Sequence, residues 1–181
     1  MSLVTVSLGS NIEPARHIRL CLDALADTFG SLEVSRVFES EPVGFSDRRN
    51  FFNLVVAFHS DWTPGELQAW AKQLEANHGR TPDTAKYSPR ALDIDLLTVG
   101  DACGIVDGIT LPRAEINYNA FVLQPLAELL PTHCHPHCRT PYATLWAAFE
   151  LGAQRLWAID FEWQGTWISQ ADTPLRQALA R

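Results

Sequence analysis

The hydrophobic residues change period repeatedly along residues 3–97, and the order of these periods constrains the fold more than any other feature. Apolar and polar residues alternate where a strand is expected, and apolar residues recur every three to four positions where a helix is expected. The strand patterns cover residues 3–8, 32–43, 51–58 and 91–97, and the helical patterns cover residues 14–29 and 64–78. Two helices in this order can cover the same face of one antiparallel sheet. We therefore expect an α+β fold with a ferredoxin-like β-α-β-β-α-β core.

The ends of the two expected helices carry start and stop signals. Gly30 follows the first helical pattern as a stop, and Thr63-Pro64-Gly65-Glu66 opens the second as a capping box with proline at the first helical position. Beyond the last strand pattern, residues 105–111 fit a short hairpin, and residues 120–130 and 145–149 form further apolar segments.

The length of 181 residues suits one domain with a substantial core. We expect a domain over residues 1–150 and a C-terminal extension over residues 151–181 that packs on it. The extension is aromatic, with Trp157, Phe161, Trp163 and Trp167. The favoured interpretation is that it covers a face or an edge of the sheet, and a dimer contact is the alternative, so monomer and homodimer both stay open.

Charge and cysteine usage exclude several classes of protein. The net charge of −7 argues against a general nucleic-acid-binding surface, so any anion site must be local. The chain opens on a strand pattern without a secretory signal, and no apolar run reaches the length of a membrane span. Four widely spaced cysteines do not suggest a disulfide scaffold, so we expect a cytoplasmic protein.

Two carboxylates interrupt the last strand pattern. Because Leu92, Ile94 and Leu96 alternate with them, Asp93 and Asp95 share one face, with Cα atoms about 6.6–7 Å apart. Such a pair can hold a divalent ion or bracket two ions, and a preceding arginine would suit a metal-bound polyphosphate. The alternative is a pair of aspartates on the solvated face of an edge strand, held in salt bridges.

Residues 80–90 precede this strand as a polar loop with the densest basic cluster of the chain, formed by Arg80, Lys86 and Arg90. A loop of this kind suits a phosphate clamp. Asn53 is the polar member of an apolar strand, and it either satisfies loop backbone or reads the edge of a heteroaromatic ligand. Neither a phosphate-binding P-loop motif nor a dinucleotide-binding glycine motif is present.

Residues 133–138 read His-Cys-His-Pro-His-Cys. Thiols and imidazoles at this density could ligate zinc or another soft metal. However, all of these groups crowd into one short segment without a second cluster to complete a typical structural site. A segment that binds no metal is therefore the alternative, and the one we favour.

Several separated motifs, in this order, resemble the 6-hydroxymethyl-7,8-dihydropterin pyrophosphokinases of folate biosynthesis. The resemblance covers roughly residues 3–150. The motifs are Gly9-Ser10-Asn11, Pro42-x-Gly44 with Phe51 and Asn53, Gly79-Arg80, Pro89-Arg90-x-Leu92-Asp93-x-Asp95-x-Leu97 and Phe121-x-Leu123-x-Pro125-Leu126.

The resemblance implies an ATP-dependent diphosphotransferase that passes a diphosphate to the pterin hydroxymethyl group and releases AMP. It makes Asp93 and Asp95 the ligands of two Mg²⁺ ions, and it gives Arg80 and Arg90 the task of neutralising the transferring phosphates. The expected pterin-binding residues are Ser40, Val43, Phe51, Asn53 and Phe121, with Asn53 bonded to the heterocycle and the two phenylalanines stacked on its faces. The expected nucleotide-binding residues are Glu75, Lys86, Tyr87, Leu96, Thr110 and Arg113.

The chain departs from the family pattern in and after the basic loop. Pro82 and Lys86 stand where arginines are common, and Arg113 occupies the place of a nucleotide-contacting histidine. Because lysine lacks the bidentate fork of arginine, we expect weaker phosphate clamping in the loop, with Arg113 compensating. Two alternatives follow: a diverged paralogue that binds pterin or nucleotide with altered substrate or little turnover, and a ferredoxin-like protein-interaction module.

Overall fold

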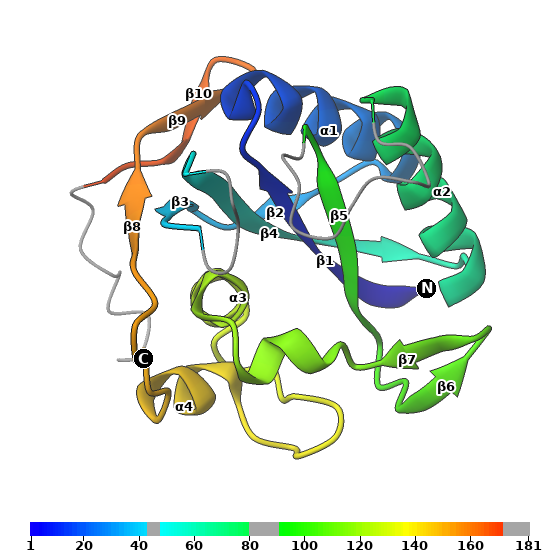
Figure 1. Ribbon diagram of the computed structural model, residues 1–181. Coiled ribbons are helices and arrows are strands. Elements are labelled where there is room, and N and C mark those ends of the chain that lie inside the picture. Colours follow the sequence, from blue (N-terminus) through cyan, green and yellow to red (C-terminus); the bar gives the residue numbers. More distant parts are fainter. Residues whose placement is uncertain (43–47, 80–90, 172–181) are drawn as a thin grey trace.

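The computed structural model describes residues 1–42, 48–79 and 91–171 (Figure 1). The elements up to the aspartate strand are β1 (Ser2–Ser10), α1 (Pro14–Phe29), β2 (Glu33–Val34), β3 (Val37–Ser40), β4 (Phe51–Ser60), α2 (Pro64–Asn77) and β5 (Asp93–Val99). The later elements are β6 (Gly104–Val106), β7 (Ile109–Leu111), the 3-10 helix η1 (Ala114–Asn117), α3 (Ala120–Leu129), α4 (Tyr142–Ala147), β8 (Leu156–Ile159), β9 (Phe161–Trp163) and β10 (Thr166–Ser169).

The main sheet has the strand order β5-β1-β4-β3-β8, and β2 also pairs with β4. All of these pairs are antiparallel. The β-α-β-β-α-β order, with α1 and α2 on one face of the sheet, confirms the predicted ferredoxin-like α+β core (Figure 1). The aspartate strand β5 lies at one edge of the sheet and is paired along its inner side with β1.

The single strand predicted over residues 32–43 is in fact two strands, β2 and β3, because a serine side chain replaces part of the ladder. The Ser35 hydroxyl accepts a hydrogen bond from the Val55 amide at 2.9 Å and donates one to the Arg36 carbonyl at 2.8 Å. The hydroxyl of Ser35 therefore does locally what a backbone group does in a regular strand. The sequence pattern alternates through this point and gave no sign of the break.

The first core lies between the sheet and the helices α1 and α2. It contains Ile18, Leu22 and Leu25 from α1, which face the inward side chains of β1, β4 and β5. The predicted capping box is confirmed at the start of α2, where Thr63 accepts a hydrogen bond from the Glu66 amide and Glu66 accepts one from the Thr63 amide. This box fixes the start of the helix that packs behind β5.

The second core lies on the opposite face of the sheet, where α3 packs (Figure 1). It includes Val55 from β4 and Leu126 from α3, which are both fully buried. Leu96 belongs to the first core and Leu97 to the second, as alternation along a strand requires, and a register shift between β1 and β5 adds one residue on the β5 side at this point. The two faces of β5 are therefore covered by different helices.

The strands after residue 155 join the rest of the fold at two places. Strand β8 pairs with β3 and forms the other edge of the main sheet. The β9–β10 hairpin contacts α1, because the Trp163 indole donates a hydrogen bond to Asp23 at 2.9 Å and Arg19 donates one to the Glu162 carbonyl at 2.8 Å. The division into a 1–150 domain and an extension stays a prediction. In the described ranges, no helix is long and apolar enough to cross a membrane.

Candidate functional site

A row of residues that lie opposite one another crosses three strands on the face that α3 covers in part. Gly9 of β1 lies opposite Asp93 of β5 on one side and opposite Asn53 of β4 on the other. Residues directly opposite one another in antiparallel strands point to the same face. Asp93 and Asn53 therefore share a face, about 10 Å apart at two strand spacings, with only a glycine between them.

The adjacent row carries the second aspartate. Asp95 lies opposite Ser7, which lies opposite Val55 of the second core. Asp93 and Asp95 thus point to the same face, as the alternation with Leu92, Ile94 and Leu96 predicts. The buried side chains of Ile94 and Leu96 lie in the first core on the other side.

Three of the predicted pterin-binding residues gather at the other end of the row. Ser40 lies opposite Phe51, and the Asn53 amide donates a hydrogen bond to the Ser40 hydroxyl at 2.8 Å and a longer one to the Phe51 carbonyl at 3.5 Å. Asn53 is buried, so these bonds fix the orientation of its amide group. Phe121 lies in the first turn of α3 and is half-buried against the second core.

Arg113 and Glu115 complete the charged groups at the aspartate end. The Arg113 guanidinium lies 3.0 Å from Asp95 Oδ1 and 2.9 Å from Glu115 Oε1. Burial and the neighbouring Asp93 raise the pKa of Asp95 to about 6, although Arg113 acts in the opposite direction. A cation close to Asp95 favours its ionised form, so this face of β5 suits a positively charged ligand.

A buried carboxylate holds the aspartate strand from behind. Glu75 of α2 accepts a hydrogen bond from the Ile94 amide at 2.8 Å and pairs with Lys72 at 3.1 Å. The Ile94 amide lies between the two aspartates and faces away from β1, so no strand partner is available for it in the described sheet. Glu75 therefore fixes the backbone that carries Asp93 and Asp95.

Glu75 and Leu96 do not join the face that carries the aspartates. Their side chains are only 1% and 3% exposed, and both lie on the side of the sheet that α1 and α2 cover. Contacts from these two side chains to a nucleotide stay predictions without support in this geometry. Thr110 is exposed on β7, opposite Ile105 of the hairpin, and its predicted nucleotide contact also stays untested.

Five predicted site residues lie outside the described ranges. Val43 belongs to residues 43–47, and Arg80, Lys86, Tyr87 and Arg90 belong to residues 80–90. Their roles stay predictions.

The His-Cys segment forms a compact turn around one histidine. His135 is buried, and its Nδ1 accepts hydrogen bonds from the backbone amides of His137 and Cys138 at 3.3 Å. In the part of the chain that the structure describes, no three His, Cys, Asp or Glu side chains are grouped so as to hold a metal ion by themselves. Nδ1 of His135 is therefore used within the turn itself.

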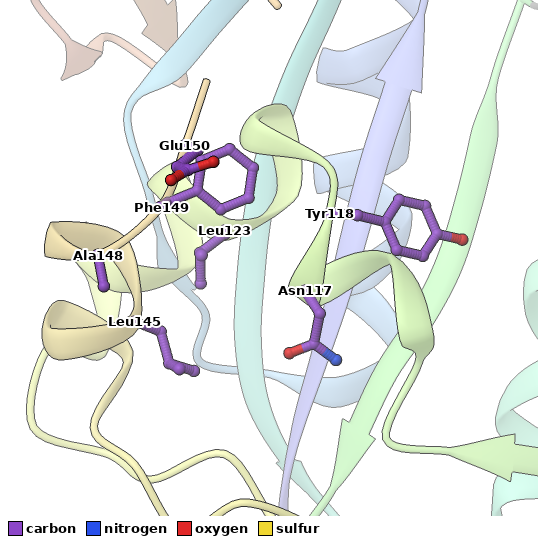
Figure 2. Close-up of a pocket in the computed structure, with 7 residues that line it drawn as sticks. All are labelled: Asn117, Tyr118, Leu123, Leu145, Ala148, Phe149 and Glu150. Carbon is purple, nitrogen blue, oxygen red and sulfur yellow. The ribbon is translucent and has the colours of Figure 1, made fainter. Parts of the chain in front are cut away.

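A pocket of about 370 Å³ lies at the C-terminal end of η1. It is lined by Asn117, Tyr118, Leu123, Leu145, Ala148, Phe149 and Glu150, and Figure 2 shows these side chains around the space between η1, α3 and α4. Of the predicted site residues that the structure describes, none lines this pocket.

Sequence reasoning missed Glu115 and the supporting role of Glu75. Glu115 lies in the short helix η1, and no period or motif marks it; only its spacing of two residues from Arg113 offered a hint. The contact between Glu75 and the Ile94 amide joins residues 19 positions apart and depends on how α2 packs behind β5.

Comparisons with known proteins point to one family. A model of the family described as 7,8-dihydro-6-hydroxymethylpterin-pyrophosphokinase (HPPK) matches residues 5–131. The chain is 36% identical over 132 residues to a 2-amino-4-hydroxy-6-hydroxymethyldihydropteridine pyrophosphokinase of Pseudomonas aeruginosa, a match that covers 71% of this chain and 80% of that one. It is 30% identical over 142 residues to the protein of the same name from Aquifex aeolicus, covering 78% and 88%.

A solved structure described as HPPK-DHPS in complex with substrates has a similar fold. The TM-score is 0.65 and the sequence identity is 10%, with 81% of this chain and 43% of that chain covered. At this identity the likeness supports the fold alone. The family match over residues 5–131 includes the β-α-β-β-α-β core and α3.

Proposed function

The chain belongs to the 7,8-dihydro-6-hydroxymethylpterin-pyrophosphokinase family, and we propose that it transfers a diphosphate from ATP to the hydroxymethyl group of 6-hydroxymethyl-7,8-dihydropterin and releases AMP. The observation that carries this proposal is the row Asp93–Gly9–Asn53. It sets a carboxylate and a buried amide on one face with a glycine, which has no side chain, between them. A flat heterocycle at one end and a metal-bound polyphosphate at the other would meet over Gly9.

Two Mg²⁺ ions at Asp93 and Asp95 are part of the proposal. Mg²⁺ usually binds proteins through one or two carboxylates plus substrate phosphates, so it needs no cage of three protein ligands. The oxygen donors fit, and the guanidinium already beside Asp95 supports a site that accepts positive charge. Bound there, the ions would neutralise charge on the phosphates.

The side chains on this face would act by binding and orientation. Asn53, held by Ser40, would present its amide to the pterin edge, and Phe51 and Phe121 would stack on the ring faces. The pterin hydroxyl is itself the nucleophile, so no nucleophilic side chain is required. In-line positioning and charge neutralisation supply the rate, with Arg113 and the loop residues Arg80 and Arg90 proposed for the phosphates.

The test is AMP release by the purified protein with ATP, Mg²⁺ and 6-hydroxymethyl-7,8-dihydropterin. Asp95→Ala should abolish transfer and leave pterin binding, measured by calorimetry, largely intact, because Asp95 lies in a different row from Asn53. Equal loss of both would assign Asp95 a structural role. A folded protein that binds pterin or nucleotide but releases no AMP would instead be a ligand-binding paralogue.

We also propose a cytoplasmic location and a monomeric or homodimeric state. The four cysteines, Cys21, Cys103, Cys134 and Cys138, are all free thiols, which suits a reducing compartment. Light scattering at defined concentrations distinguishes the two oligomeric states, and fractionation of the cell tests the location.

A further inference from the structure

Arg113 is held between two carboxylates at the aspartate end of the site. One terminal nitrogen, Nη2, lies 3.0 Å from Asp95 Oδ1 and 2.9 Å from Glu115 Oε1. The side chains of all three residues are about one-third exposed, at 34%, 28% and 28% for Arg113, Asp95 and Glu115. The ion pairs are therefore partly shielded from water yet reachable by a ligand.

The backbone of Arg113 is held by hydrogen bonds, whereas one nitrogen of its guanidinium has no hydrogen-bond partner in the described structure. The Arg113 amide donates a hydrogen bond to the Leu97 carbonyl at 2.9 Å, and the residue caps η1. In contrast, Nε of Arg113 is buried and has no hydrogen-bond partner in the described structure. A buried donor without a partner is costly. The backbone of Arg113 is therefore held to β5, whereas its guanidinium still has a donor, Nε, without an acceptor in the described structure.

From this geometry we propose that Arg113 is an internal counter-ion that occupies Asp95 in the metal-free protein and is displaced from it when the divalent cation binds. The inference rests on the proposed function, which makes Asp95 a metal ligand. Glu115 is the residue that retains the displaced guanidinium, because it already shares the same nitrogen. The released fork then faces the polyphosphate, whose oxygens can satisfy Nε.

Displacement predicts a change in cation affinity of the opposite sign from a purely structural role of Arg113. A guanidinium bound to Asp95 competes with the cation for the same oxygen, so its removal should strengthen cation binding in the absence of nucleotide. The same removal should weaken binding of a nucleotide together with the cation, because a phosphate partner is lost. A purely structural Arg113 would weaken both.

The first experiment measures Mn²⁺ affinity by electron paramagnetic resonance without nucleotide. We expect Arg113→Gln to bind Mn²⁺ about five- to tenfold more tightly than the unaltered protein, the range for a partly buried, charge-assisted pair. Arg113→Lys retains the charge but loses the fork, so we expect a smaller gain of about threefold. Glu115→Gln should weaken Mn²⁺ binding about threefold, because Arg113 then has Asp95 alone.

The matched control is Arg139→Gln. Arg139 also pairs with an aspartate, Asp101, at 3.3 Å, but this pair is exposed and lies outside the aspartate face. Its removal should leave Mn²⁺ affinity within about twofold of the unaltered value, because exposed charges are screened. Equal tightening in the control and in Arg113→Gln would reduce the effect to net charge and overturn the inference.

The second experiment adds a non-hydrolysable ATP analogue. Arg113→Gln should bind the Mn²⁺ complex of the analogue about tenfold more weakly, opposite in sign to its effect on Mn²⁺ alone. If, without nucleotide, Arg113→Gln binds Mn²⁺ no more tightly than the unaltered protein, displacement is contradicted. It is also contradicted if neither Arg113→Gln nor the unaltered protein binds Mn²⁺. AMP release by the unaltered protein separates these outcomes from failure of the proposed function itself.

A spectroscopic measurement follows the side chain directly. The Arg113 Nε–H resonance in a ¹⁵N-labelled sample should shift on addition of Mg²⁺. In Asp95→Asn, where the cation ligand and the ion-pair partner are both removed, the same addition should leave the resonance in place. If the resonance of the unaltered protein does not shift on addition of Mg²⁺, Arg113 stays paired with Asp95.

Discussion

Replacing Glu75 tests whether the aspartate strand is held in place by a side chain from the opposite face of the sheet. Its carboxylate accepts the Ile94 amide hydrogen bond at 2.8 Å, and its side chain is 1% exposed. Glu75→Ala removes that acceptor and leaves a buried amide at the edge of the sheet. Because alanine favours helix, the change does not weaken α2 itself.

The magnitude follows from the environment of the carboxylate. A buried amide left without an acceptor costs about 1–3 kcal/mol, and the space left by the side chain adds to it, so we expect Glu75→Ala to lower the free energy of unfolding by about 3 kcal/mol. For a chain of this length, that corresponds to a fall in Tm of about 6–12 °C. Glu75→Gln keeps an acceptor for Ile94 and mainly loses the charge facing Lys72, which is 46% exposed, so we expect about 1 kcal/mol.

The assay is urea unfolding followed by tryptophan fluorescence, with Gln73→Ala as the control. Gln73 lies on the same helix, is exposed and bonds only to Asn77 in the described contacts, so its loss should cost less than about 0.5 kcal/mol. The reasoning fails if Glu75→Ala costs less than about 1 kcal/mol, or if Glu75→Gln costs as much as Glu75→Ala.

Three further outcomes test other parts of the molecule. Asn53→Ala should raise the Kd for the dihydropterin about tenfold, because the buried amide proposed to bind the ring is lost; unchanged affinity in a fluorescence titration would show that the pterin binds elsewhere. Leu126→Ala should lower the free energy of unfolding by about 3 kcal/mol, since this fully buried side chain joins α3 to the sheet, and a loss below about 1 kcal/mol in urea denaturation would remove α3 from the core. Excess EDTA should abolish AMP release and added Mg²⁺ should restore it, whereas activity that persists in EDTA would contradict the metal role proposed for Asp93 and Asp95.

Local patterns were sufficient for the elements whose physics is local. The alternation around Asp93 and Asp95 correctly gives a shared face, and the Thr63–Glu66 capping box correctly marks the start of α2. Both depend on residues within a few positions of one another. The order of these elements then limits the sheet to few topologies, which is why the ferredoxin-like core could be predicted.

Features that depend on distant contacts could not be read from the sequence. The Ser35 hydroxyl interrupts a strand only because the Val55 amide lies within reach. The segment over residues 120–130 is apolar nearly all round, so its pattern does not say which face of the sheet it covers. The pairing of Arg113 with Asp95 joins a loop to a strand across 18 positions, and only the folded chain places the two side chains together.

The row Asp93–Gly9–Asn53 also fixes a distance across the sheet. The separation between Asn53, proposed to bind the pterin ring, and Asp93, proposed to hold a metal, is set by the hydrogen bonds of three strands. A sheet offers only two increments, about 4.8 Å across strands and about 6.6 Å to the next residue on the same face. Small adjustments of a loop cannot change this distance. If these proposed roles hold, a substrate with a longer arm between its ring and its reacting hydroxyl would need the amide moved by a whole step, and we expect such substrates to be excluded by length.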